Sequence, residues 1–218
     1  MAIVIDDCGQ QLDVMERGVR LKLPLTFAVL PHLAHSAKSA ELAHSAGQEV
    51  IVHQPMQPEA HDEDPGEGAI LQGMKTDRIG KILTASFHDV PHAVGLNNHM
   101  GSAATADRAL MVATFTALER VRPGAFFLDS RTSAATVAAD VARKQGVPTA
   151  ERAVFLDNDL SEVAIRGELA RLMGLAAERG QAVAIGHLKP ETLAVLEREM
   201  SQLEGHECRF VFLSALMR

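Results

Sequence analysis

Two adjacent aspartates, Asp6 and Asp7, follow a short apolar run close to the start of the chain. Neighbouring carboxylates resist ionising together unless a cation or a proton lies between them. A metal ion resolves that conflict. Because side chains alternate along a strand, one aspartate can bind the ion while the other reaches a water molecule. The pair therefore indicates metal-assisted hydrolysis.

Other residues that suit such a site end other apolar runs. His53 and His99 supply imidazole nitrogens, and with Asp7 they make an Asp/His/His ligand set with a position left open for water, as catalytic zinc sites require. His187, expected on the far side, could donate a proton to a leaving group. The remaining polar residues at such positions are Asn97, Asn98, Asp129 and Arg131.

The elements that position these residues are apolar, β-branched runs alternating with amphipathic ones. The predicted strands are 2–5, 25–30, 49–53, 93–97, 125–129, 153–157, 181–187 and 209–213. The predicted helices lie near 10–20, 34–46, 76–87, 105–121, 133–145, 161–179 and 190–203. Strands separated by helices pair in parallel, and in a barrel their carboxyl ends share the face that carries the active site.

This alternation predicts one α/β domain over residues 1–218, because 218 residues are too few for two ordinary α/β domains. Eight strands favour a closed or nearly closed (β/α) barrel. An open doubly wound sheet is the alternative, but the GxGxxG of its nucleotide-binding form is absent. Segment 54–74 is rich in Pro, Gly and acidic residues and is predicted to lie over the mouth of the barrel.

Composition excludes several classes of protein. A net charge of -7 and a pI near 5.8, with no Lys/Arg cluster, argue against nucleic acid as a partner. Cys8 and Cys208 lack CxxC or CxxH spacing and are predicted to be core thiols. No apolar run is long enough to cross a bilayer, so the chain as given is predicted to be soluble.

Each candidate residue has a structural alternative. Asp7 and Asp129 could cap helices. His53 could be a partly buried residue at a strand end, His99 could belong to a tight turn in NNHMGS, and His187 could sit in a strand-to-helix loop. The other histidines are predicted to be surface residues: His32, His35, His44, His61, His88, His92 and His206.

Five ordered blocks resemble the divergent polysaccharide deacetylases, relatives of the NodB-type carbohydrate esterases. The blocks are IVIDDCG (3–9), HQPMQP (53–58), GLNNHMGS (95–102), FFLDSRTS (126–133) and IGHLKPETL (185–193). The resemblance spans nearly the whole chain. It implies a deformed TIM-like (β/α) barrel, usually described with seven strands. It also implies hydrolysis of an N-acetyl or O-acetyl group with a divalent metal, commonly zinc.

The resemblance also implies roles for individual residues. The matched positions are the general base at Asp6, the metal-ligating acid at Asp7, the first metal histidine at His53 and the catalytic acid at His187. Gln57 stands where ordinary deacetylases have their second metal histidine, so His99 is the candidate for the third ligand.

Two further blocks depart from the family pattern. NNHMGS replaces the arginine-bearing block and DSRTS replaces the tryptophan-bearing block. Arg131 is therefore a candidate for orienting an aspartate, and Asp129 is counted with it among the catalytic residues. Asn97, Asn98 and Gln57 are assigned to substrate binding.

The predicted function is removal of acetyl groups from a polysaccharide or cell-wall glycan by a metal-dependent hydrolase. The main alternative is a non-catalytic barrel of the cell envelope that binds glycan or peptidoglycan. A metal phosphoesterase is disfavoured because no basic cluster is present to neutralise phosphate. By resemblance the location is the cell envelope or periplasm, with the export segment outside these residues, or the cytoplasm if the chain is complete.

Overall fold

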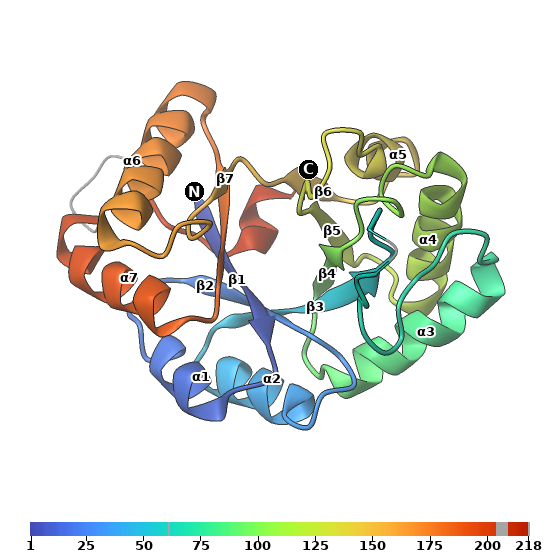
Figure 1. Ribbon diagram of the computed structural model, residues 1–218, viewed down its shortest axis with the longest axis horizontal. Helices are drawn as coiled ribbons and strands as arrows, with labels where there is room; N and C mark the ends of the chain where they lie inside the picture. Colours follow the sequence, from blue (N-terminus) through green and yellow to red (C-terminus); the bar gives the residue numbers. More distant parts are fainter. Residues whose placement is uncertain (61, 204–208, 218) are drawn as a thin grey trace.

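The computed structural model describes residues 1–60, 62–203 and 209–217, and over these ranges seven helices surround a single curled sheet of parallel strands (Figure 1). The strands are β1 (Ala2–Cys8), β2 (Leu25–Val29), β3 (Glu49–Met56), β4 (Gly95–Met100), β5 (Phe126–Asp129), β6 (Thr149–Glu151), β7 (Val154–Phe155) and β8 (Val183–His187). The helices are α1 (Leu12–Gly18), α2 (Ser36–Ser45), α3 (Thr76–Asp89), α4 (Arg108–Val121), α5 (Ala138–Lys144), α6 (Glu162–Arg179) and α7 (Pro190–Leu203). Every predicted helix is present.

The sheet curls so strongly that its two edge strands are consecutive in the sequence. Its strand order is β6-β5-β4-β3-β2-β1-β8-β7, so β6 and β7 form the edges although only Arg152 and Ala153 separate them in sequence. The Arg152 amide donates to the Asp129 carbonyl (3.0 Å), and the Ala153 amide donates to the Val183 carbonyl (2.8 Å). This curled half-barrel confirms the predicted deformed TIM-like barrel and rules out the open doubly wound sheet.

Both faces of the strands are buried, as near-continuous apolar strands require. Ile3 and Ile5 belong to the outer cluster, which packs the sheet against the helices. Ala2 and Val4 belong to an inner cluster inside the barrel. Complete burial of one such aliphatic side chain contributes roughly 1.5–3 kcal/mol, so this alternation fixes which side chains face the barrel interior.

The C-terminal region differs from the sequence-based prediction. Residues 209–212 form no strand, so the predicted strand at 209–213 is wrong, and a 3-10 helix, η1 (Leu213–Leu216), follows them. Leu213 closes the inner cluster from below, and its amide donates to the Thr26 hydroxyl (3.1 Å). Within this run only Leu213 is fully buried; Phe210, Val211 and Phe212 are partly buried, and the Val211 amide donates to the Met1 carbonyl (2.9 Å). The short strand β6 was not predicted.

In segment 54–74, Gly68 and Ile70 are hydrogen-bonded to the end of β3. Residues 54–56 extend β3, and the Ile70 amide donates to the Pro55 carbonyl (2.9 Å). The Gln54 side chain donates to the Gly68 carbonyl (2.9 Å). These hydrogen bonds hold the segment against one side of the barrel mouth.

Two further expectations can be compared with the described residues. Cys8 is a buried free thiol, as predicted, whereas Cys208 lies outside the described residues. Within the described ranges, every helix is too short or too polar to cross a lipid bilayer.

Candidate active site

The carboxyl ends of β1 and β8 place two site residues side by side inside the barrel. Val4 and Ile185 belong to the inner cluster, so Asp6 and His187, each two residues further on, also face inward. The two strands pair Asp6 with His187 in register. The predicted base and acid are therefore neighbours on adjacent strands.

The carboxyl ends of β3 and β4 place a second group on the same face. Ile51 belongs to the inner cluster, so His53 points inward, and it pairs in register with Asn97 on β4. His99 follows Asn97 by two residues on the same face. The sheet thereby brings both candidate metal histidines to the mouth.

Asp7 reaches this group through an irregularity in β1. The β1–β2 register shifts between Ile5 and Cys8, and Asp7 has a φ of 59°. Helix α1 begins instead after Gln11, so the alternative that Asp7 caps this helix is wrong. The bulge allows two consecutive aspartates to serve one site.

Three potential ligand atoms converge there. Asp7 Oδ1 lies 3.3 Å from His53 Nε2 and 3.2 Å from His99 Nδ1, and the two nitrogens are 3.0 Å apart. Ligands about 2.0–2.2 Å from a tetrahedral zinc ion lie about 3.3–3.6 Å from one another. The triangle is therefore within a few tenths of an ångström of the size that a bound cation requires.

The chemistry of the three donors also fits a cation. Asp7 Oδ1 is buried and accepts no well-oriented hydrogen bond from the described residues. His53 Nδ1 lies 2.7 Å from Asn97 Oδ1, and the Asn97 amide nitrogen donates to Asp6 Oδ1 (2.9 Å). His53 Nδ1–H must therefore donate to Asn97, which leaves Nε2 as the ring nitrogen that faces the triangle and can bind a metal. The residues present fit a divalent metal.

Electrostatics at this group favour a positive charge. Burial raises the pKa of Asp7, but its contacts with His53 and His99 lower that pKa by more, to well below the usual range of an aspartate. Burial lowers the pKa of His53, but Asp6 and Asp7 raise it, to about 9. Without a metal, the cluster therefore retains a proton on His53 near neutral pH.

Asp6 stands next to the ligands but is held separately. It is 3% exposed, its Oδ1 accepts from Asn97, and its Oδ2 lies 3.6 Å from His53 Nε2. Burial raises the pKa of Asp6, while His53 and Asn97 partly offset the effect. A carboxylate with a raised pKa is a stronger base than one in water, which suits proton abstraction.

Asp157 was missed by the sequence reasoning, and it orients His187. The β7–β8 register pairs Phe155 with Ile185, and two further steps place Asp157 beside His187. Asp157 Oδ1 lies 2.8 Å from His187 Nδ1, while Oδ2 accepts from the His187 amide and the Thr192 hydroxyl, both at 2.6 Å. Asp157 is the last residue of the predicted strand 153–157, just as other site residues end their predicted strands. That position was the signal in the sequence that could have identified it.

The Asp157 contact sets the proton affinity of His187. Burial lowers the pKa of His187, but the hydrogen bond and charge of Asp157 raise it by more. Burial raises the pKa of Asp157, yet the hydrogen bonds that it accepts from His187 and Thr192 leave this pKa below the usual value of an aspartate.

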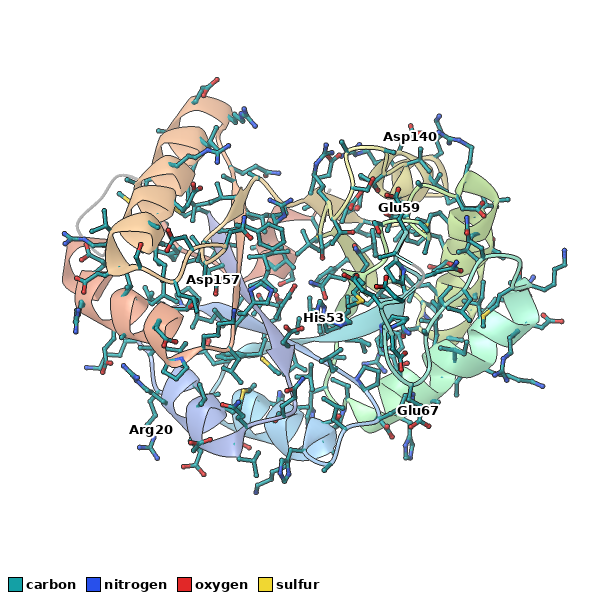
Figure 2. The ribbon with its side chains drawn as sticks, in the orientation of Figure 1. Arg20, His53, Glu59, Glu67, Asp140 and Asp157 are labelled. Carbon is teal, nitrogen blue, oxygen red and sulfur yellow. The ribbon has the colours of Figure 1, made fainter. Side chains whose placement is uncertain are left out.

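Figure 2 shows Asp157 towards α6 and α7 and His53 beside β3, both near the middle of the molecule.

Asp129 and Arg131 are not joined to this group by any contact in the described residues. Phe127 belongs to the outer cluster, so Asp129 faces away from the barrel interior. Its oxygens accept from the Arg131 amide and the Thr136 hydroxyl, each at 2.8 Å. The Arg131 guanidinium instead binds Glu151 (2.7 Å). Asp129 thus holds a turn before α5.

The three amides assigned to substrate have partners within the protein. Asn97 is fully buried between Asp6 and His53. Asn98 donates to the Met100 carbonyl (2.7 Å) and accepts from the Ser130 amide (2.9 Å). The Gln57 side chain accepts from the Gln72 amide (2.8 Å). Their contacts hold Asp6, His53 and the neighbouring loops in place.

Of the histidines predicted to be surface residues, His44, His88 and His92 are exposed, whereas His32 and His35 are partly buried. The His32 side chain is 17% exposed and its Nδ1 lies 2.7 Å from Asp89. The His44 and His92 rings stack with centroids 3.7 Å apart. His61 and His206 lie outside the described residues.

Curated relatives of similar sequence come from two bacteria. The uncharacterized protein YibQ of Escherichia coli is 38% identical over 204 residues, which are 93% of this chain and 63% of that protein. An uncharacterized protein of Haemophilus influenzae is 34% identical over 203 residues, covering 93% of this chain and 71% of that protein. The chain thus spans a little under two thirds of the length of the Escherichia coli relative.

Solved structures share the fold. An uncharacterized protein of Agrobacterium tumefaciens superposes with a TM-score of 0.92 at 22% identity, over 99% of this chain and 87% of that one. The catalytic domain of a peptidoglycan N-acetylglucosamine deacetylase of Eubacterium rectale gives 0.53 at 14% identity, over 97% and 87%. A mutant of a CE4-family pseudoenzyme, described as having restored enzymatic activity, gives 0.54 at 12% identity, over 99% and 66%.

The family assignment rests on a match that covers nearly the whole sequence. The profile of the divergent polysaccharide deacetylases matches residues 3–217. These residues include every strand that contributes to the site, from Asp6 on β1 to His187 on β8. The chain belongs to the divergent polysaccharide deacetylase family.

Proposed function

We propose that this protein is a metal-dependent hydrolase that removes acetyl groups from a polysaccharide or cell-wall glycan. The observation that carries the proposal is the convergence of Asp7, His53 and His99 beside Asp6, a buried carboxylate outside the ligand triangle. Family membership supports an acetylated glycan as the substrate. The nitrogen and oxygen donors suit zinc, which commonly binds such sets in hydrolases.

The cation would be held by Asp7, His53 and His99. When bound, it would supply Lewis-acid polarisation of the acyl group and lower the pKa of water at the site. Asp6 would take the proton from the attacking water, because Asn97 fixes its Oδ1 and leaves Oδ2 beside the ligands. Burial of Asp6 strengthens it as a base.

His187 would protonate the departing amine or hydroxyl. Its Nδ1 is bound to Asp157, so Nε2 is the ring nitrogen that remains for the substrate. Because the pKa of His187 is raised, its imidazole stays protonated to a higher pH than that of an ordinary histidine. Because Asp6 and His187 pair in register on adjacent strands, base and acid would both face the same space at the barrel mouth.

Replacement of Asp6 by Asn tests the catalytic assignment. We expect acetate release from an acetylated chito-oligosaccharide or peptidoglycan fragment to fall about 10²–10⁴-fold, the usual contribution of a general base. Metal content, measured by elemental analysis, should stay near that of the wild type. Asp13→Asn, at an exposed acid on α1, is the matched control and should keep full activity.

Full activity in Asp6→Asn would contradict the assignment. If the wild type binds both metal and glycan but releases no acetate, the non-catalytic binding barrel is the better description. A location in the cell envelope, where such glycans occur, belongs to the same proposal and stays a prediction.

A further inference from the structure

An arginine, a phenylalanine and the proposed acid form a stacked group on the β7 side of the mouth. The Arg152 guanidinium carbon lies 3.7 Å from the centre of the Phe155 ring. The Phe155 and His187 rings are nearly parallel, with an interplanar angle of 13° and centroids 6.0 Å apart. Phe155 therefore contacts both the cation and the imidazole through its flat surface.

Sheet register explains why Phe155 meets His187. Phe155 pairs with Ile185 across β7 and β8, so His187, two residues further along, is its diagonal neighbour on the same face. Phe155 also packs against the inner cluster, which limits its freedom. The ring thus provides a fixed plane beside the imidazole.

Arg152 is held in turn by the chain at the barrel seam. Its Nε donates to the Ser130 carbonyl (2.7 Å) and its Nη2 to the Arg131 carbonyl (2.9 Å). Two such bonds fix the plane of a guanidinium, which then lies over Phe155. A lysine ammonium has neither the fork nor the flat face, so it cannot reproduce both contacts.

The Asp157 hydrogen bonds restrain His187 at its backbone amide and at one edge of its ring. A single hydrogen bond to Nδ1 still tolerates some rotation about the second side-chain torsion, which has broad minima in histidine. A flat contact against the ring restricts that torsion. The direction of Nε2, which would face the leaving group, depends on it.

We propose that Arg152 and Phe155 are positioning residues that fix the imidazole plane of His187. The proposal rests on the role of His187 as the acid in the proposed function. Phe155 acts by direct contact and Arg152 acts through Phe155. Neither residue needs to touch the substrate.

Kinetics of four variants test the positioning. Arg152→Lys and Phe155→Leu should each lower kcat about 10- to 100-fold with KM within about twofold, because the acid is misplaced while substrate contacts remain. Phe155→Tyr, which keeps the ring, should retain activity close to that of the wild type. The double variant Arg152→Lys/Phe155→Leu should be no worse than the poorer single variant, since both act through one stack.

A matched control separates the stack from the surrounding charge. Arg143→Met removes a neighbouring arginine that binds Glu151 outside the stack, and it should leave kcat and KM unchanged. Additive losses in the double variant, or equal losses in Phe155→Tyr and Phe155→Leu, would overturn the proposal. If Arg152→Lys does not fold, the two Phe155 variants decide.

NMR relaxation of the His187 ring gives a readout that does not depend on turnover. The imidazole signals should be sharp in the wild type and Phe155→Tyr, and broadened by microsecond-to-millisecond exchange in Phe155→Leu. Sharp signals in all three would overturn the positioning claim. If the wild type has no deacetylase activity, the proposed function fails, but the relaxation measurement still decides whether the stack holds the ring.

Discussion

The two sides of the barrel mouth differ in whether their buried carboxylates have hydrogen-bond partners within the chain. On the β7–β8 side, the carboxylate of Asp157 accepts hydrogen bonds from the His187 ring, the His187 amide and the Thr192 hydroxyl, all within the chain. On the β1–β3–β4 side, three lone-pair donors crowd within 3.3 Å, and the buried oxygen of Asp7 accepts no well-oriented hydrogen bond from the described residues. The acid side has all its partners within the chain, whereas the other side has a donor set that could hold a metal ion.

Because of this difference, metal binding and proton donation would depend on separate residues of one face. Asn97 links Asp6 to His53 and belongs wholly to the ligand side. Phe155 and Asp157 belong wholly to the acid side. Variants on each side should therefore change different measured quantities.

The largest expected effect is on metal affinity. Asp7→Asn removes the anionic ligand, so the dissociation constant for zinc should rise by more than about 100-fold. Loss of a residue that only hydrogen-bonds a metal ligand already raises it by up to roughly 100-fold. Isothermal titration calorimetry measures this directly. Asp157→Asn, on the acid side, is the matched control and should bind zinc as the wild type does. Equal zinc affinity in the wild type and Asp7→Asn would remove the distinction between the two sides.

The next effect is on turnover, from the acid side. Asp157→Asn should lower kcat about 10²-fold, because His187 loses the carboxylate that orients it and raises its pKa. The loss should grow as pH rises, since a lower pKa deprotonates the acid earlier. A pH profile of acetate release checks this, and a loss that is constant with pH would argue against His187 as the acid.

A smaller effect should follow from the residue that supports the ligand side. Asn97→Ala removes the acceptor that holds His53 Nδ1, so zinc affinity should fall about 10- to 100-fold, as it does for other outer partners of metal ligands. Asn98→Ala, which disturbs only loop contacts, is the comparison. Equal zinc affinities in these two variants would mean that Asn97 does not orient the ligand.

A further expected effect, which needs no substitution, is a pH dependence of zinc binding. The pKa of His53 without metal is about 9, so below that pH a proton must leave before the metal binds. Affinity should therefore rise about tenfold per pH unit up to about pH 9 and then level off. Calorimetry in buffers of different ionisation enthalpy counts the proton released. An affinity that does not change between pH 6 and 8 would contradict the assignment of His53.

Much of the site was predictable because parallel strands deliver their carboxyl ends to one face. That rule brought Asp6, His53, His99 and His187 together without knowledge of register. It failed for Asp129, where side-chain alternation sends the carboxylate outward. The strand-end rule needs the side-chain direction as well as the position.

Other features depended on contacts that one sequence does not reveal. Asp157 acts through a two-residue strand whose register with β8 is set by the curled sheet. Arg131 binds Glu151 on β6, a strand too short to show periodicity. Residues 209–213 have the composition of a strand, yet residues 209–212 form none, and the burial of Leu213 against the inner cluster is a tertiary effect.

The central claim is that Asp7, His53 and His99 together bind a divalent metal. A crystal grown with zinc, with diffraction recorded on both sides of the zinc absorption edge, tests it most directly. We expect an anomalous peak about 2.0–2.2 Å from the Asp7 carboxylate, His53 Nε2 and His99 Nδ1. An anomalous map without a peak at these three side chains, at a zinc concentration that saturates the protein in solution, would contradict it.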